Sequence, residues 1–408
     1  MIIASMGGTH RYILTVNAGS SSIKLALFAQ TPANTGPTRL FDVTTTNIGQ
    51  ESSVLSVQAS DQEKTSRDIQ ASDHSAAIAL MMEQLVARID TAEIKVVGHR
   101  VVYGGNQFYQ PTPITDEVAS QLGEFVHFDP EHAPASLAII ALLRQDLPQA
   151  QHVACFDTSY FHDLPKVAQL VAIPRRYQAI GVRRYGYHGL SYRYLTKRFQ
   201  DIAGEAAVNG RVIYAHLGSG VSLAATMNGK PVETTMGFSP TSGVVMSSRS
   251  GDIDPSLARF LTKETGMSID EYNHMLNFES GLLGVSGLSS DMYTLLQNEA
   301  TNPAAAAAVE LFCYQVRKSI GALATTIGGI DSLVFSGGIG EQAPLIRARI
   351  CEGLEFLGIS LDPVLNSEHR ELISSGGSAV GVHIIPTDEA TIIAQDATTI
   401  ASLNQGTY

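Results

Sequence analysis

The stretch YILTVNAGSSSIKLALF, residues 12–28, decides the fold. An apolar run, Tyr12–Val16, is followed by a glycine- and serine-rich turn and then by the alternating pattern of Ile23–Phe28, which is typical of a strand. The same order of apolar run, turn and apolar run returns in RVIYAHLGSGVSLAATM, residues 211–227. Paired halves of this kind predict an α/β protein with a duplicated two-lobe architecture and a site in the cleft between the lobes.

The segments around these two hairpins extend the same picture. The spacing of apolar residues predicts helices over Ala76–Ile89, over Asn302–Ile327 and over the last segment, which starts near Glu389. Further apolar runs predict strands at Lys95–Val102, His152–Phe156, Ser332–Phe335 and Val382–Ile385. The polar segment from Thr31 to about Ser75 is expected to hold edge strands and a surface loop rather than core. We expect one lobe from 1–157 plus 389–408, and a second, for nucleotide binding and dimerisation, from 158–388.

Composition restricts the function. The chain has 408 residues, which is enough for two large lobes or three smaller ones, and 44% of them are hydrophobic. Its formal charge of −12 argues against nucleic acid and an anionic membrane surface as partners. The N-terminal segment lacks a basic stretch before an apolar one, and the apolar runs are shorter than the ~18 residues of a membrane span. We expect a soluble cytoplasmic protein whose three scattered cysteines, Cys155, Cys313 and Cys351, are buried in a reducing compartment.

Three glycine-rich turns follow apolar strands directly. The first runs from Asn17 through Ser22, with Lys24 beyond it; the second is Gly218-Ser-Gly220; the third is Gly337-Gly-Ile-Gly340. Backbone N–H groups, hydroxyls and a nearby ammonium are the groups that bind phosphate, although a plain hairpin turn would explain any one of these turns alone. None is a Walker loop or a Rossmann fingerprint. Their repetition favours phosphate binding.

Two arginines stand in glycine- and serine-rich surroundings, Arg100 in GHRVVYGG and Arg249 in SSRSGDIDP. A guanidinium group binds carboxylate and phosphate oxygens with two parallel hydrogen bonds, so both arginines suit an anionic substrate. The alternative is an ion pair with a nearby acid, which for Arg249 would be Asp252 or Asp254. We expect catalysis rather than scaffolding.

Histidines and carboxylates leave two interpretations open. His188, His132 and His216 are either turn or core histidines or donors that stabilise a phosphoryl group. Asp157 and Glu389 are either helix-start charges or ligands for Mg²⁺, which one or two carboxylates hold together with phosphate oxygens. The sequence contains no HExxH motif, no cysteine–histidine cluster and no EF-hand loop, and no GxSxG motif.

Taken together, the motifs resemble the acetate kinase family along nearly the whole chain. The matching pieces are VNAGSSSIKLALF, GHRVVYGG, CFDTSYFHDLP, RRYGYHGLSY, AHLGSGVSLAA, MGFSPTSG with RSGDIDP, SGLLGVSGLSSD, FSGGIGE and IPTDEATIIAQD. The resemblance implies the two-lobe fold shared with actin, hexokinase and heat-shock chaperones. It also implies a homodimer, Mg²⁺ with Mn²⁺ as an alternative, and reversible phosphoryl transfer between ATP and a short-chain carboxylate.

The resemblance also implies residue roles. Catalysis is expected of five residues: Arg100, Asp157, His188, Arg249 and His132. The magnesium site would use Asn17 and Glu389. The carboxylate would be bound by Arg100, Val102, Tyr187 and Pro240. The nucleotide and its phosphates would contact Ser20, Ser22, Lys24, His216, Gly218, Ser219, Gly220, Asp291, Met292, Tyr293, Gly338, Ile339, Gly340 and Gln342.

The chain departs from the family pattern at several positions. Ser219 and Asp388 each replace an asparagine that is usual in the family. Asp291-Met292-Tyr293 replaces the usual Asp-Phe-Arg, and Gln342 departs from the usual end of a GENS-like loop. Glu131 precedes His132 where an apolar residue is usual, and Tyr187 replaces phenylalanine. We therefore expect acetate or propionate as acceptor, with butyrate open, and weaker ATP binding, with pyrophosphate as the alternative donor. A nucleotide-responsive binding protein and a sugar kinase are the alternatives from other classes.

Overall fold

The computed structural model describes residues 11–19, 21–30, 36–60, 62–128 and 133–405. The chain divides into two compact units. Unit 1 is Met1–Ser159 with Asp388–Tyr408, and unit 2 is Tyr160–Thr387. Within the described ranges, no helix is long and apolar enough to cross a membrane.

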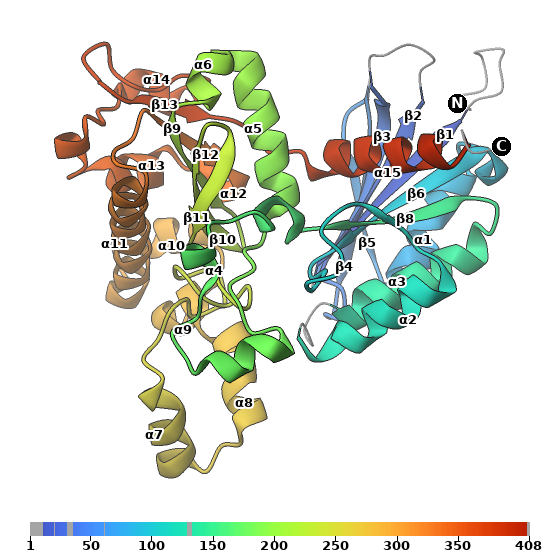
Figure 1. The fold of residues 1–408 in the computed structure, drawn as a ribbon, viewed down its shortest axis with the longest axis horizontal. Helices are drawn as coiled ribbons and strands as arrows, with labels where there is room; N and C mark the ends of the chain where they lie inside the picture. The colour runs from blue at the N-terminus through green and yellow to red at the C-terminus, as the bar shows by residue number, and fades with distance from the viewer. Residues whose placement is uncertain (1–10, 20, 31–35, 61, 129–132, 406–408) are drawn as a thin grey trace. The chain divides into compact units, whose positions relative to one another are not determined.

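Unit 1 is built on a mixed sheet of eight strands in its described part, in the order β5-β4-β3-β2-β1-β6-β8-β7 (Figure 1). Strand β1 pairs antiparallel with β2 and parallel with β6, and β6 pairs parallel with β8. The strands are β1 (Tyr12–Ala18), β2 (Ile23–Ala29), β3 (Thr38–Thr46), β4 (Ser53–Ala59), β5 (Thr65–Ile69), β6 (Ile94–Val101), β7 (Thr112–Pro113) and β8 (Gln151–Phe156).

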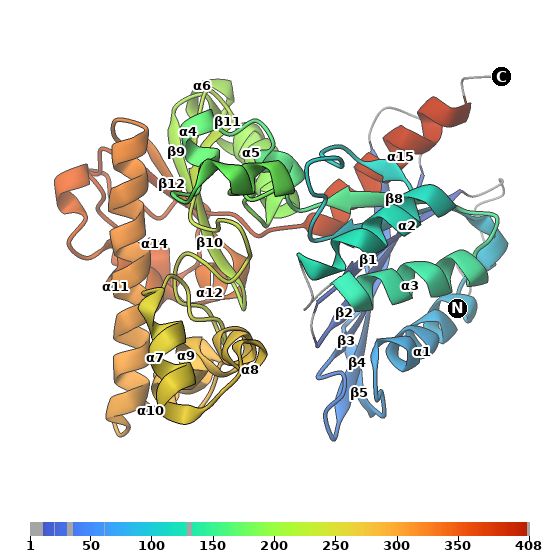
Figure 2. The ribbon, with the colours of Figure 1, turned by 60° about the horizontal axis from the view of Figure 1, so that its bottom comes forward.

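Helices cover both faces of this sheet. Helix α15 (Glu389–Gln405) packs on β1, β6 and β8, whereas α1 (His74–Val86) and α3 (Ala133–Asp146) pack on the other face (Figure 2). Helix α2 (Asp116–Glu124) packs on α3. Asp73 fixes the start of α1, because its carboxylate accepts a hydrogen bond of 2.8 Å from the Ala76 N–H.

Unit 2 has a sheet of five strands among its described residues, in the order β11-β10-β9-β12-β13. The strands are β9 (Arg211–Leu217), β10 (Val221–Met227), β11 (Lys230–Thr234), β12 (Ser332–Ser336) and β13 (Gly381–Ile384). Three antiparallel strands are followed by two parallel ones, which is the arrangement of β3-β2-β1-β6-β8 in unit 1. The predicted duplicated α/β fold is confirmed.

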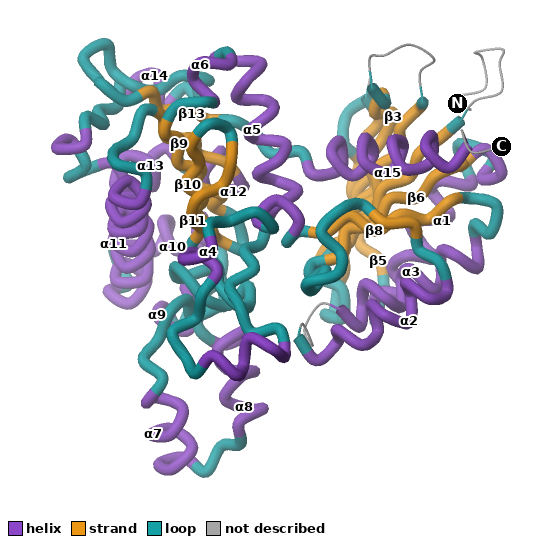
Figure 3. The backbone as a smooth tube through the Cα atoms, viewed as in Figure 1, coloured by secondary structure: helices purple, strands orange, loops and turns teal. Residues whose placement is uncertain are grey.

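Two long helices flank the second sheet. Helix α5 (Gly189–Ala203) shares a core with β9 and β10, and α11 (Pro303–Thr326) packs on β9, β10 and β11. A long loop, drawn in teal in Figure 3, joins β11 to α7. The remaining helices are α4 (Lys166–Gln169), α6 (Glu205–Val208), α7 (Ser256–Thr265), α8 (Ile269–His274), α9 (Gly281–Ser286), α10 (Met292–Asn298), α12 (Gly337–Gln342), α13 (Pro344–Cys351) and α14 (Pro363–Ser367).

Two sequence-based expectations were wrong in part. The polar segment before α1 forms β3, β4 and β5, of which only β5 is at the edge of the described sheet. Phe41, Val43 and Leu55 lie in the core because α1 covers that end of the sheet. The third glycine-rich turn is in fact the helix α12, which begins immediately after β12. The three cysteines are buried, as expected.

A buried histidine pair in unit 1 makes stability depend on pH. His99 Nε2 lies 2.9 Å from His152 Nδ1, and His152 Nε2 lies 3.3 Å from the Leu147 carbonyl oxygen. Burial lowers the pKa of both imidazoles below that of an exposed histidine. The folded state therefore binds fewer protons than the unfolded state at acidic pH. The resulting stability is complete above about pH 6.5 and is lost as the pH falls below it.

We expect the free energy of unfolding in urea to fall between pH 7 and pH 5. His99→Gln should reduce the slope of that fall by the amount that corresponds to up to one proton taken up on unfolding. The control is His274→Gln, which removes a histidine whose side chain is 61% exposed. An unchanged slope in His99→Gln would assign the pH dependence to other groups.

Candidate active site

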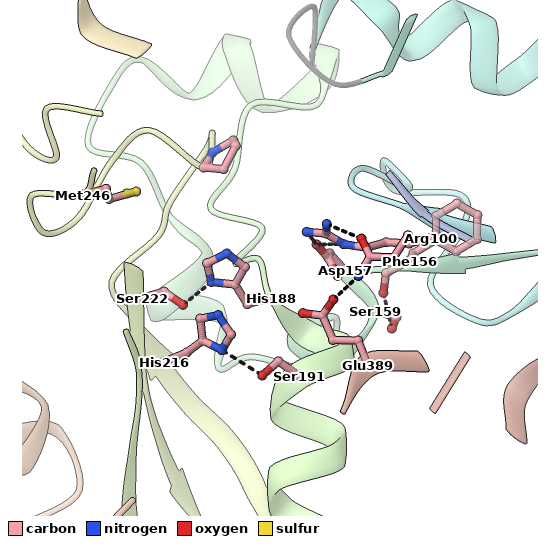
Figure 4. Close-up of polar contacts among 12 residues, drawn as sticks. Arg100, Phe156, Asp157, Ser159, His188, Ser191, His216, Ser222, Met246 and Glu389 are labelled. Carbon is pink, nitrogen blue, oxygen red and sulfur yellow. Dashed lines mark hydrogen bonds and ion pairs between the residues drawn. The ribbon is translucent and has the colours of Figure 1, made fainter. Parts of the chain in front are cut away.

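In unit 1, Arg100 and Asp157 meet at the carboxyl ends of two neighbouring strands. Arg100 is the second-last residue of β6, and Asp157 follows β8 directly, so parallel pairing brings them to one edge of the sheet. The Arg100 guanidinium donates to Asp157 Oδ2 from Nε at 3.0 Å and from Nη2 at 2.6 Å (Figure 4). The Asp157 side chain is only 1% exposed, so the guanidinium compensates a buried carboxylate.

Asn17 and Glu389 extend this cluster. Arg100 Nη1 donates to Asn17 Oδ1 at 2.9 Å, and Asn17 Nδ2 donates to Glu389 Oε2 at 2.5 Å. Asn17 lies in β1, and Glu389 is the first residue of α15. Four segments that are far apart in the sequence thus form one hydrogen-bonded row, Asp157–Arg100–Asn17–Glu389. Arg100 therefore forms an ion pair, and its partner Asp157 is itself a predicted site residue.

The start of α15 is fixed independently of Glu389. Asp388 accepts hydrogen bonds from the Thr391 N–H at 3.1 Å and from Thr391 Oγ1 at 2.6 Å, and it also pairs with Arg39 of β3. Asp388 is therefore the residue that caps the helix. The Glu389 carboxylate instead points into the row with Asn17.

The first glycine-rich turn is a tight hairpin between β1 and β2. The Gly19 N–H donates to the Ser22 carbonyl at 2.7 Å, and His74 Nε2 lies 2.8 Å from the Gly19 carbonyl oxygen, which ties the hairpin to α1. Lys24 is exposed and stands opposite Asn17 in the strand register. Ser20, Glu131 and His132 lie outside the described residues.

Unit 2 holds two of the three predicted histidines, His188 and His216. His188 precedes α5 in the left-handed region, with φ of 60°. Its Nδ1 lies 2.8 Å from Ser222 Oγ in β10, and its ring centroid is 4.6 Å from that of His216. His216 Nδ1 lies 2.9 Å from Ser191 Oγ, which is 2.7 Å from Thr387 Oγ1. Hydroxyl groups from α5 and β10 therefore orient both imidazole rings.

The Gly218–Gly220 turn lies directly beside His188 and Arg249. Gly218 N–H donates to the Gly220 carbonyl at 3.1 Å. A Cβ added to Gly220 would lie 2.9 Å from His188 Nε2 and 3.6 Å from Arg249 Nη1. The two predicted charge-stabilising groups thus meet at the predicted phosphate turn.

Arg249 lies on the loop between β11 and α7. Its Nη1 donates to the Pro240 carbonyl at 3.3 Å, so the two predicted residues lie together. The loop is closed by the Met246 N–H, which donates to the Arg249 carbonyl, and Gly281 packs so tightly there that a Cβ would lie 2.3 Å from the Met246 oxygen. Asp252 and Asp254 accept backbone N–H bonds of 2.8 and 2.7 Å.

The tight approach at Gly220 gives a prediction. Gly220→Ala should push His188 or Arg249 out of place and lower kcat by about ten- to a hundredfold, because small displacements of catalytic groups are costly. The melting temperature should change little. The matched control is Gly321→Ala in α11, where a Cβ meets nothing within 4 Å. Full activity in Gly220→Ala would separate this turn from catalysis.

Helix α12 contains Gly338, Ile339 and Gly340, the predicted adenosine segment. Arg347, which is fully buried, donates from Nη1 to the carbonyls of Gly340 at 2.8 Å and Glu341 at 2.9 Å. Burial lowers the pKa of Arg347 to about 10, so it remains charged at neutral pH. Glu341 Oε1 in turn accepts from the N–H of Gly337 at 2.8 Å and of Thr387 at 3.1 Å. Sequence reasoning did not single out Arg347, which lies outside the quoted motifs, and it gave no anchoring role to Glu341, the last residue of FSGGIGE.

The predicted nucleoside contacts differ in their surroundings. Asp291 caps α10 by accepting from the Thr294 N–H at 3.0 Å, and Met292 is only 3% exposed and packs in the interior. Tyr293 is 69% exposed. Its ring is therefore accessible for stacking, whereas the Met292 side chain is part of the core. Gln342 is exposed as well.

The residues predicted to bind the acyl group are buried. Tyr187 is 1% exposed, and its hydroxyl donates to the Phe238 carbonyl at 2.7 Å, two residues before Pro240. The tyrosine hydroxyl therefore has a partner and holds the loop that carries Pro240. Val102 is 6% exposed in unit 1.

The fold repeats an α/β unit with glycine-rich segments directly after apolar strands. Arginine, histidine and carboxylate groups lie near these segments, as in a phosphotransferase. A family model described as the acetokinase family matches residues 12–395. The chain is 41% identical over 390 residues to the acetate kinase of Rhodopseudomonas palustris strain TIE-1, covering 94% of this chain and 96% of that one. This chain belongs to the acetokinase family.

Two solved structures are similar in sequence and fold. The Porphyromonas gingivalis acetate kinase structure matches with a TM-score of 0.83 and 34% identity, over 96% of this chain and 99% of that one. The structure of a propionate kinase from Francisella tularensis subsp. tularensis SCHU S4 matches with a TM-score of 0.87 and 33% identity, over 95% and 99%.

Proposed function

We propose that this protein is an acetate kinase that transfers the γ-phosphoryl group of ATP reversibly to acetate, giving acetyl phosphate and ADP. The observation that carries the proposal is the meeting of His188 Nε2 and Arg249 Nη1 at the Gly218–Gly220 turn. The imidazole of His188 can donate a hydrogen bond whether it is neutral or positively charged, and the guanidinium of Arg249 is positively charged. Both suit the negative charge of a transferring phosphoryl group.

In this proposal the groups act by position and charge, without a covalent enzyme intermediate. Arg249 and His188 stabilise the phosphoryl oxygens, and backbone N–H groups of the Gly218–Gly220 turn hold the nucleotide phosphates. Arg100 orients the acceptor carboxylate, and the buried Asp157 fixes the Arg100 guanidinium by two hydrogen bonds. Orientation of this kind matters because reaction requires the attacking oxygen and the phosphorus to be held close and in line.

The oxygen groups of Asn17 and Glu389 suit Mg²⁺, a cation that prefers oxygen ligands. Among the described residues there is no group of three or more histidine, cysteine or acidic side chains that would hold a metal alone. That fits a magnesium ion shared with nucleotide phosphates, which needs only one or two protein carboxylates. Bound there, the ion would neutralise charge on the phosphate oxygens. Asn17 would orient the Glu389 carboxylate through its 2.5 Å hydrogen bond.

Trapping the product as a hydroxamate tests the acceptor. We expect acetate or propionate to give the highest rate with ATP, and a shallow preference between them, because one methylene changes binding by only ~1–3 kcal/mol. The hydroxyl of Tyr187 already donates to the Phe238 carbonyl, so it is not an unpaired polar group. A clear preference for butyrate, or for a hydroxylated or dicarboxylic acid, would contradict the assignment.

The donor should be ATP, bound less tightly than by a relative with arginine at position 293. Losing a charged hydrogen bond costs ~1.5–3 kcal/mol, and exposed Tyr293 would recover part of this by stacking on the base. We expect Tyr293→Arg to lower the KM for ATP by roughly ten- to a hundredfold and GTP to compete in the parent protein. Tyr314→Arg, at an exposed tyrosine of α11, is the control. Turnover with pyrophosphate and with no nucleotide would contradict the proposal.

We further propose a cytoplasmic homodimer formed through unit 2. Large apolar side chains are exposed on its α7 and on the segment before α5, namely Val167, Leu170, Ile180, Leu257 and Phe260. Burying such side chains against a second copy would stabilise a dimer. Light scattering should then give twice the mass of the chain.

A further inference from the structure

A chain of two buried hydroxyl groups contacts His188. Ser222 Oγ lies 2.8 Å from His188 Nδ1 and 2.6 Å from the Tyr192 hydroxyl oxygen. Ser222 and Tyr192 are 0% exposed, and His188 is 8% exposed. The spacing of α5 supplies this arrangement, because the Tyr192 N–H donates to the His188 carbonyl at 3.0 Å and brings both side chains toward β10.

The direction of these hydrogen bonds follows from counting hydrogens. Burial raises the pKa of Tyr192, so its hydroxyl keeps its proton and must donate it. In the part of the chain that the structure describes, Ser222 Oγ is the acceptor within reach. The Ser222 hydroxyl then donates its own hydrogen to His188 Nδ1. The opposite direction would bury the Tyr192 O–H without an acceptor, which is unfavourable.

A neutral imidazole that accepts at Nδ1 carries its hydrogen on Nε2. That nitrogen is the one beside the Gly220 turn, 2.9 Å from the position of an added Cβ, with Arg249 Nη1 3.6 Å from the same position. The hydroxyl chain therefore presents an N–H, and not a lone pair, at the predicted phosphate turn.

We propose that Ser222 and Tyr192 are positioning residues that hold His188 as the Nε2–H tautomer, ready to donate to the transferring phosphoryl group. The inference rests on the proposed role of His188 in phosphoryl transfer. The other tautomer would turn a lone pair toward negatively charged oxygens, and a donor fixed in advance is what stabilises developing charge.

The tautomer is measured directly by long-range ¹H–¹⁵N NMR of histidine-labelled protein at pH 8, with His188 assigned by its loss in His188→Asn. We expect a protonated Nε2 and an unprotonated Nδ1 in the parent protein. Tyr192→Phe should let the Ser222 hydroxyl turn and produce a mixture. Ser222→Ala with Tyr192→Phe, which leaves no orphaned hydroxyl, should produce the mixture as well.

Kinetics supply a second readout. Both Tyr192→Phe and the double variant should lower kcat by about ten- to a hundredfold, the usual effect of removing a group that orients a catalytic ligand, with little change in the KM for nucleotide. The control is Tyr160→Phe, which removes a partly buried hydroxyl bonded to Thr196 at 2.9 Å and leaves the chain to His188 intact. Its tautomer and kcat should match the parent.

The two readouts separate this inference from the proposed function. A parent protein with Nδ1 protonated, or variants whose tautomer does not change, would overturn the positioning role whatever the activity. The predicted tautomer in a protein that makes no acyl phosphate would leave the hydroxyl chain correct and refute the kinase assignment.

Discussion

Arg249→Ala should lower kcat by about a hundred- to a thousandfold while the protein remains folded. Arg249 contacts the Pro240 carbonyl from an irregular loop and lies at the Gly218–Gly220 turn with His188. Removing one preorganised donor to a developing negative charge typically costs ~3–4 kcal/mol of transition-state stabilisation. The measurement is kcat with saturating ATP and acetate, together with the melting temperature.

Arg249→Lys is the matched control, because lysine keeps the charge and loses the planar pair of donors. We expect it to recover only a small part of the lost rate. Loss of the thermal transition in Arg249→Ala, with activity kept in the folded fraction, would show that Arg249 is a structural residue.

Arg100→Ala should lower both activity and stability. Its guanidinium makes two hydrogen bonds to Asp157, whose side chain is 1% exposed. Removing one partner of a buried ion pair leaves the other charge uncompensated and costs ~3–5 kcal/mol when burial is complete. Because Arg100 is 15% exposed and water can reach the pair from its side, we expect about 2–3 kcal/mol in urea unfolding.

A second variant identifies the cause. Adding Asp157→Asn to Arg100→Ala removes the buried charge and should restore more than half of the lost stability, while activity stays low. If the double variant is no more stable than Arg100→Ala, the lost stability does not come from the carboxylate.

Much of the fold could be predicted because its pattern is local. The alternation of Ile23–Phe28 and the apolar run of Tyr12–Val16 depend only on neighbouring residues, and the repeat near residue 211 predicted the duplication. The strands before α1 were expected at the edge, but only β5 lies there, and the burial of Phe41 in β3 was missed because it depends on a helix that follows later in the chain.

Candidate site residues were predicted where glycine and charge stand together, and were not predicted where a side chain contacts the candidate site through tertiary packing alone. Arg100 and Arg249 stand out in their loops. Ser222 and Tyr192 look like ordinary strand and helix residues, and only tertiary packing brings them to His188. The sequence around Arg347 is typical of an arginine on a helix surface. Its guanidinium instead donates hydrogen bonds to the carbonyls of Gly340 and Glu341. The sequence also could not foresee that Asp157 would be the partner of Arg100.

The most direct test of the kinase assignment follows the phosphorus atoms. In ³¹P NMR of the purified protein with ATP, Mg²⁺ and excess acetate, we predict that part of the γ-phosphoryl signal is converted to an acetyl phosphate signal, with ADP formed in equal amount. Omitting acetate should stop the conversion. Formation of ADP and inorganic phosphate at the same rate with and without acetate would contradict the account.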